Sequence, residues 1–168
     1  QLTEPLTLGV MLRARRFDSR DRTRRVAGAA DRGEWTIAPV TINAYYDNAL
    51  NEIVMPAVFL QPPVFSTDAD AAANYGALGA AVGHELSHAL DARVFHARGE
   101  PLVKLFGTFT PLPGHAVDGR LTLDENIGDL AGLTAAYRAY QQSLNGRPAP
   151  TIDGLTGDQR FFISFGQS

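Results

Sequence analysis

Apolar residues recur at helical spacing in a long stretch of the chain between residues 66 and 92. They fall three or four positions apart, as they do on one face of an amphipathic helix. Ser66 or Thr67 can cap the start of this helix, because a hydroxyl oxygen accepts a hydrogen bond from a free N–H group of the first turn. The pattern predicts a helix that continues to about Ala92. Its apolar stripe comprises Tyr75, Leu78, Val82, Leu86 and Leu90.

A second stretch with the same periodicity begins near Thr122. Asn145 and Gly146, followed by Pro148, supply the signals at which a helix stops. The pattern predicts a second amphipathic helix between these limits. Its apolar stripe comprises Leu130, Leu133, Tyr137, Tyr140 and Leu144.

Two shorter runs indicate β-structure. Residues 40–46 are rich in β-branched and aromatic residues, and a second apolar run covers residues 53–60. Pro56 has no N–H to donate to a ladder, so the pairing is expected to be interrupted there or to lie at an edge. An edge strand of this kind can bind an extended peptide, although the residues alone favour an ordinary hairpin that covers the core. With a further short helix near residues 158–165, the expected fold is mainly α with a small β-sheet (α+β).

The composition fits one globular core in 168 residues, with 45% hydrophobic and 20% charged residues. Seven arginines fall between residues 13 and 25, and the simplest interpretation is a solvated helix or loop. Phe17 is the single aromatic residue in that stretch and the net charge of the chain is −3, so we expect no nucleic-acid partner. No apolar run is long enough for a membrane span, and the lack of cysteine excludes thiolate metal sites and disulfides.

The pentapeptide His84-Glu85-Leu86-Ser87-His88 carries the strongest chemical signal. Histidines four positions apart point the same way on a helix, so both imidazoles can reach one Zn²⁺. Glu85 is offset by about 100°, which places it beside the metal, where a general base for water is needed. The alternative is a pair of core histidines with a surface glutamate.

A third metal ligand is available at the start of the second predicted helix. Glu125 and Asp129 are four residues apart and share a helix face, so Glu125 can complete a His₂Glu set while Asp129 orients a histidine. Thr122 and Glu125 also fit a capping box, in which Glu125 only binds a backbone N–H. The upstream histidine motif favours the ligand role. Asp91, three residues after His88, can also hold an imidazole from outside the ligand set.

Three blocks of the chain resemble the catalytic region of the neprilysin-type zinc endopeptidases: residues 42–63, 74–91 and 118–137. The resemblance implies a thermolysin-like catalytic domain with one zinc per chain. It also implies the role of each matched residue. His84, His88 and Glu125 would bind zinc, and Glu85 would activate the water. Asp129 and Asp91 would steady the histidines, and Asp129 would also assist catalysis. Asn43 and Ala44 would bind the substrate backbone.

The chain departs from the family pattern in several places. Segments that family members have near residues 17–25 and 101–102 are missing from this sequence. They are either truly deleted or left out of the sequence as given. The N-terminal helical part and the C-terminal end, with its catalytic histidine and arginine, have no counterpart. His96 and His115 do not stand in matching contexts. We therefore expect residues 1–168 to be part of one zinc-metallopeptidase catalytic domain.

The expected function is that of a zinc-dependent endopeptidase, which hydrolyses short peptides by metal-activated water with Glu85 as general base. The resemblance suggests cleavage on the amino side of hydrophobic residues. The alternatives are a zinc aminopeptidase of the same ligand class and a non-catalytic peptide-binding relative. Expected partners are peptide substrates and the remaining segments of the same enzyme. A bacterial periplasmic or secreted location is expected, with the cytoplasm as the alternative.

Overall fold

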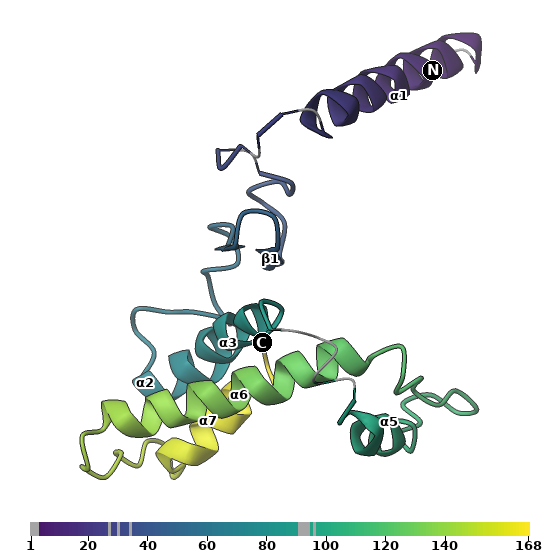
Figure 1. The fold of residues 1–168 in the computed structure, drawn as a ribbon. Coiled ribbons are helices and arrows are strands. Elements are labelled where there is room, and N and C mark those ends of the chain that lie inside the picture. Colours follow the sequence, from purple (N-terminus) through teal and green to yellow (C-terminus); the bar gives the residue numbers. More distant parts are fainter. Residues whose placement is uncertain (1–3, 27, 30, 34, 91–94, 96) are drawn as a thin grey trace. The chain divides into compact units, whose positions relative to one another are not determined.

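The computed structural model describes residues 4–26, 28–29, 31–33, 35–90, 95 and 97–168 (Figure 1). The chain divides into two compact units, Gln1–Thr36 and Ile37–Ser168. The described part is rich in helix and contains one two-stranded sheet, which confirms the expected α+β class. No helix among the described residues is both long and apolar enough to cross a membrane.

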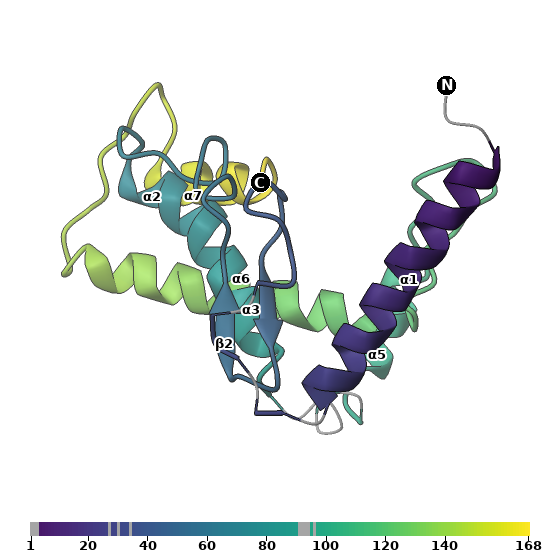
Figure 2. The same ribbon diagram turned by 90° about the horizontal axis from the view of Figure 1, so that it is seen from above.

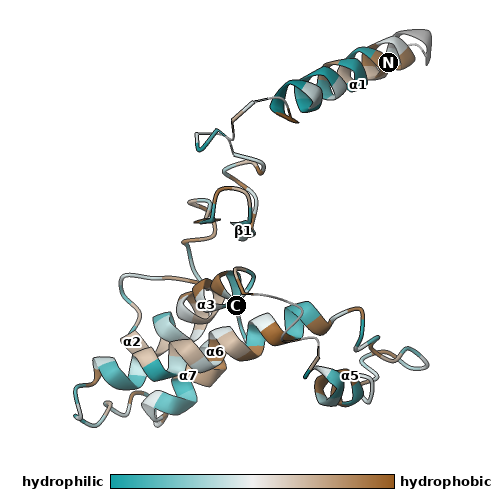
Figure 3. Ribbon diagram, viewed as in Figure 1, coloured by the Kyte–Doolittle hydropathy of each residue, from teal (hydrophilic) through white to brown (hydrophobic). Residues whose placement is uncertain are grey.

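The first unit contains helix α1, Glu4–Val26. Its arginine-bearing half is hydrophilic (Figure 3), in line with the interpretation of this stretch as a solvated helix or loop. Asp21 accepts hydrogen bonds from Arg25 Nε at 2.6 Å and from Arg24. The hydrogen bond from Arg25 and the two positive charges lower the pKa of Asp21.

The second unit begins its helical part with an unbroken run made of α2 (Ala71–Asn74), the π-helical turn η1 (Tyr75–Gly79) and α3 (Ala80–Ser87). Asp70, and neither Ser66 nor Thr67, caps its start by accepting a hydrogen bond from Ala73 N at 3.1 Å. The predicted cap is wrong because the backbone of Ser66 is bound by the Asn74 side chain, which donates to Ser66 O at 2.8 Å. The predicted end near Ala92 lies outside the described residues.

Helix α6, Leu123–Ser143, crosses α3, and this is the most extensive contact between elements in the described part of the chain. The two helices approach closely where Gly83 meets Gly132. A Cβ atom added to Gly132 would lie 2.4 Å from His84 N and 2.5 Å from Ala80 O, far inside contact distance. The crossing therefore requires a residue without a side chain, and it sets how α6 faces the histidine-bearing turn.

Helix α7, Gly157–Phe165, packs beside α2 and α6 (Figure 2). A capping box formed by Thr156 and Gln159 fixes its start. Asp158 accepts a hydrogen bond from Gln141 Nε2 of α6 at 2.8 Å, and a hydrogen bond with Asp158 raises the pKa of Tyr137. The buried core between these helices comprises Ala72, Ala80, Ala136, Tyr140 and Phe161. Helix α5, Glu100–Phe106, was not predicted.

The hairpin is shorter than the sequence pattern predicts. Strand β1, Tyr45–Asp47, pairs antiparallel with β2, Glu52–Val54. Residues 40–44 do not extend β1, because Thr41 N donates to Ala38 O and Asn43 N donates to Thr41 O in local turns. Beyond β2 the pairing ends just before Pro56, as expected, and the chain turns there.

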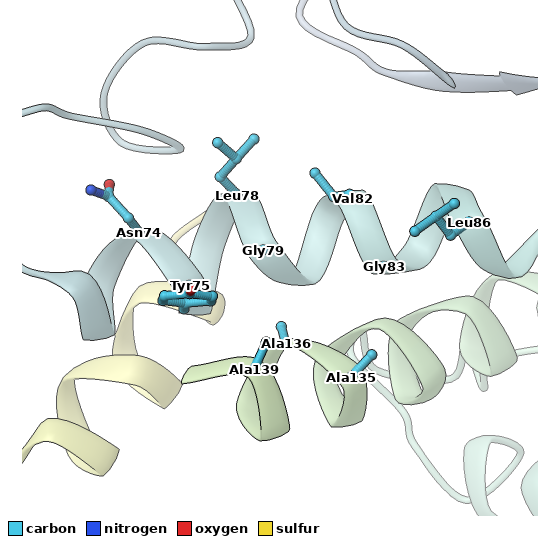
Figure 4. A pocket seen from close by; sticks show the side chains of 10 residues that line it. All are labelled: Asn74, Tyr75, Leu78, Gly79, Val82, Gly83, Leu86, Ala135, Ala136 and Ala139. Atoms are coloured by element: carbon cyan, nitrogen blue, oxygen red, sulfur yellow. The ribbon is translucent and has the colours of Figure 1, made fainter. Parts of the chain in front are cut away.

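The apolar stripe of the helical run α2–η1–α3 faces a groove of about 400 Å³ between that run and α6 (Figure 4). Leu78, Val82 and Leu86 come from one side, and small side chains such as Ala135 and Ala139 come from α6. Leu86 is 53% exposed. The helical periodicity is thus confirmed, but its apolar face is only partly covered.

Candidate metal centre

Two helices bring three potential metal ligands together. His84 lies near the end of α3, His88 is the residue that caps its C-terminus, and Glu125 lies in the first turn of α6. His84 Nε2 is 3.1 Å from His88 Nε2 and 3.1 Å from Glu125 Oε2. One ligand atom from each of the three residues lies within 4.8 Å of the other two. The three side chains therefore converge on one point.

The chemistry and spacing of these donors fit zinc. Tetrahedral zinc with bonds of about 2.0–2.1 Å holds neighbouring donor atoms about 3.3 Å apart, close to the two separations of 3.1 Å. Two imidazole nitrogens and one carboxylate oxygen form a set that leaves one position open for water or substrate. Glu125 is on the open side of the cluster, with 66% of its side chain exposed, whereas the His84 side chain is 17% exposed.

Asp129 fixes the orientation of the His84 ring. Its Oδ1 atom lies 2.7 Å from His84 Nδ1, so the ring can donate its Nδ1 proton to the carboxylate. That hydrogen bond leaves the lone pair on Nε2 directed at the cluster. The four-residue spacing of Glu125 and Asp129 brings both carboxylates within hydrogen-bond distance of the same imidazole.

The capping-box alternative for Glu125 is not realised. Thr122 precedes α6, but its side chain makes no capping hydrogen bond to the helix. Instead Thr122 Oγ1 donates to Asp118 O at 3.2 Å and accepts a hydrogen bond from Asn126 Nδ2 at 2.9 Å. The Glu125 carboxylate is directed towards His84.

A pocket of about 400 Å³ is lined by two of the three ligands, His84 and Glu125. Glu85, His84 and Asp129 line its polar part together with Asn43. The large apolar side chains in its wall are Phe59, Val64 and Phe165. The general-base candidate and a cavity with apolar walls are therefore on the same side of the cluster. On another side, His88 and Glu125 line a polar pocket of about 270 Å³ with Tyr46 and Asn48.

The two other predicted residues, Ala44 and Asp91, and the two histidines outside the pentapeptide have different outcomes. Ala44 is buried and does not line the pocket that contains Asn43. Asp91 and His96 lie outside the described residues. His115 is in a turn, paired with Leu112, and does not belong to the metal-binding group. Sequence reasoning missed Phe59, Val64 and Phe165, because apolar residues in a wall have no motif of their own.

A family model described as peptidase family M13 matches residues 43–100 and 91–168, which is more than half of the chain. This chain belongs to peptidase family M13. The resemblance to neprilysin-type zinc endopeptidases is thereby confirmed, and M13 membership implies a zinc enzyme.

The similar proteins are much longer than this chain. Endothelin-converting enzyme 1 of Bos taurus is 39% identical over 163 residues, covering 83% of this chain and 21% of the relative. Neprilysin-3 of Drosophila melanogaster is 31% identical over 175 residues, covering 90% of this chain and 22% of the relative. The chain thus spans about a fifth of the length of the curated relatives it matches.

Solved structures show the same fold. Zinc metalloprotease ZMP1 of Mycobacterium tuberculosis, in complex with an inhibitor, has a TM-score of 0.79 and 44% identity, covering 88% of this chain and 27% of the other. PepO of Lactobacillus rhamnosis has a TM-score of 0.64 and 28% identity, covering 81% and 24%. Relatives come from animals and bacteria, and the bacterial source expected for this chain stays a prediction.

Proposed function

We propose that this chain carries the zinc-binding and peptide-hydrolysing centre of an M13 metalloendopeptidase. His84, His88 and Glu125 would hold one zinc ion. The observation that supports this most is the convergence of their donor atoms at separations that suit tetrahedral zinc. Zinc bound in this way supplies a Lewis acid for the scissile carbonyl and lowers the pKa of water towards about 7.

Glu85 would act as the general base. It lines the pocket beside the ligands without belonging to the ligand set, as the spacing of the pentapeptide requires. From that position its carboxylate takes a proton from the attacking water and delivers it to the departing amine. Asp129 holds the Nδ1 proton of His84, which keeps the imidazole oriented during the reaction.

The substrate would be a short peptide that binds along the same pocket. Asn43 would contact the peptide backbone, with Ala44 at the adjacent position. The wall of Phe59, Val64 and Phe165 suits an apolar side chain. We assign this pocket to the residue after the scissile bond, which gives cleavage on the amino side of a hydrophobic residue.

The full domain would include parts beyond these residues, because the relatives are about five times longer than the region matched here. Residues 1–168 are then part of one catalytic domain, and the remaining segments of the same enzyme would complete the substrate chamber. On this proposal the 168 residues alone bind zinc but turn substrate over weakly. A periplasmic or secreted location would suit an enzyme of this class.

A peptide with a blocked N-terminus and one phenylalanine tests the proposal in the zinc-loaded protein. We expect cleavage before the phenylalanine, and a loss of roughly 10²–10⁴-fold in kcat for Glu85→Gln with zinc content unchanged. Glu100→Gln, on the exposed side of α5, is the matched control and should leave kcat and zinc content unchanged. Turnover in Glu85→Gln equal to that of the parent would contradict the role of Glu85, and trimming only of unblocked peptides would indicate an aminopeptidase.

A further inference from the structure

The start of the metal-site helix is tied to α7 by a largely buried ion pair. Asp70 caps α2 through Oδ1, and its Oδ2 accepts hydrogen bonds from Arg160 Nε at 2.8 Å and Nη2 at 2.5 Å. Arg160 Nη1 donates to Leu155 O at 2.6 Å, ahead of α7. The Arg160 and Asp70 side chains are 11% and 23% exposed. The pair is thus well satisfied and only weakly screened by solvent.

A second contact fixes α7 against the same helix one to two turns further along. A Cβ atom added to Gly76 of η1 would lie 2.1 Å from Phe161 O, so the two backbones touch there. The Phe161 side chain is fully buried and stacks on Tyr140, with ring centroids 5.8 Å apart. Two neighbouring residues, Arg160 and Phe161, therefore fix the position of α7 along the helix that carries the pentapeptide.

The consequence of this register appears at the other end of α7. Phe165 follows Phe161 by four residues, so it lies on the same side of α7 and about 6 Å further along. There it forms part of the wall of the pocket that contains Glu85. A shift of α7 relative to Asp70 would move this wall relative to the ligands.

We propose that Arg160 is a positioning residue that sets the apolar wall of the pocket through Phe165. Two N–H groups of the Arg160 guanidinium donate to the same carboxylate oxygen of Asp70, and this planar arrangement fixes α7. A single lysine ammonium group does not reproduce it. The residue thereby helps to select substrates with a bulky apolar side chain in that pocket. This role rests on the proposed peptidase function.

The test compares two blocked peptides that differ only by phenylalanine or alanine after the scissile bond. The ratio of their kcat/KM values measures how well the wall discriminates. We expect Phe165→Ala and Arg160→Met each to lower this ratio about tenfold with zinc content unchanged, and Arg160→Lys to recover part of it. Arg147→Met, in the exposed loop before α7, is the matched control and should keep the parent ratio.

Hydrogen–deuterium exchange provides a readout that does not require activity. Arg160→Met should speed exchange of the α7 amides while those of α3 near His84 keep their parent rates. Slower exchange of the α7 amides in the parent than in Arg160→Met supports the positioning role whether or not a peptide is cleaved. If no peptide is cleaved but this difference in exchange is seen, only the proposed function fails.

The inference is overturned if Phe165→Ala lowers the ratio while Arg160→Met and Arg160→Lys both stay within twofold of the parent. If Arg160→Met does not fold, Arg160→Lys alone provides the test. The inference is then overturned if Arg160→Lys has the same kcat/KM ratio and the same α7 exchange rates as the parent.

Discussion

His84 Nδ1 lies 2.7 Å from Asp129 Oδ1, across the contact between α3 and α6. The same imidazole directs Nε2 at Glu125 and His88. One carboxylate therefore determines which nitrogen of His84 is free to bind a metal. Because Asp129 and Glu125 lie one turn apart on α6, that helix supplies both a ligand and the group that orients another ligand.

Removal of the Asp129 carboxylate should weaken zinc binding without abolishing it. We expect Asp129→Ala to raise the Kd for zinc about 10–100-fold, since the imidazole loses the acceptor that fixes its tautomer. Asp129→Asn keeps an acceptor oxygen and should lie between Asp129→Ala and the parent. Competition with a chelating dye measures the zinc affinities of the parent and the two variants. Equal affinity in all three proteins would show that Asp129 does not orient His84.

A side chain at the helix crossing should destabilise the fold. Gly132→Ala places a methyl group 2.4 Å from His84 N and 2.5 Å from Ala80 O, so α6 must move away from α3. We expect the free energy of unfolding in urea to fall by about 3 kcal/mol, at the upper end for overpacking a core. Gly166→Ala is the control, because its Cβ would meet only ordinary contacts. Similar stability of both variants would be incompatible with the close crossing.

Thr122 should matter for stability but not for zinc. Thr122→Val removes the acceptor of the buried Asn126 amide, and a buried polar group left without a partner costs about 1–3 kcal/mol. Zinc content should stay at the parent level, since Thr122 and Glu125 do not form a capping box. Loss of zinc in Thr122→Val would show that Thr122 is needed to place Glu125, and it would contradict the independence of the two residues. Denaturant titration and metal analysis of the same sample separate the two results.

The sequence predicts the centre of the site better than its surroundings. His84 with His88, and Glu125 with Asp129, are four-residue pairs within single helices, so local periodicity is enough to place each pair on one face. The cap at Asp70 was missed because Asn74 binds the backbone of Ser66 from eight residues away. The start of β1 was placed too early, because local turns over residues 38–43 compete with ladder pairing.

The wall of the pocket lies beyond local prediction. Phe165 reaches the pocket only because α7 is registered by the Asp70–Arg160 pair and by the contact of Gly76 with Phe161, and both link positions far apart in the sequence. The exposure of Leu86 in the groove between α3 and α6 is equally non-local. Periodicity identifies an apolar face, but the extent to which that face is covered depends on the tertiary packing.

The most direct test of the account is the zinc content of the purified protein, measured together with that of Glu125→Ala and Asp124→Ala. The two residues are adjacent in the first turn of α6, but only Glu125 belongs to the group of converging donors. The account predicts about one zinc per chain in the parent and in Asp124→Ala, and its loss in Glu125→Ala. No zinc in the parent, or zinc retained in full by Glu125→Ala, would contradict the His₂Glu centre and with it the proposed hydrolysis.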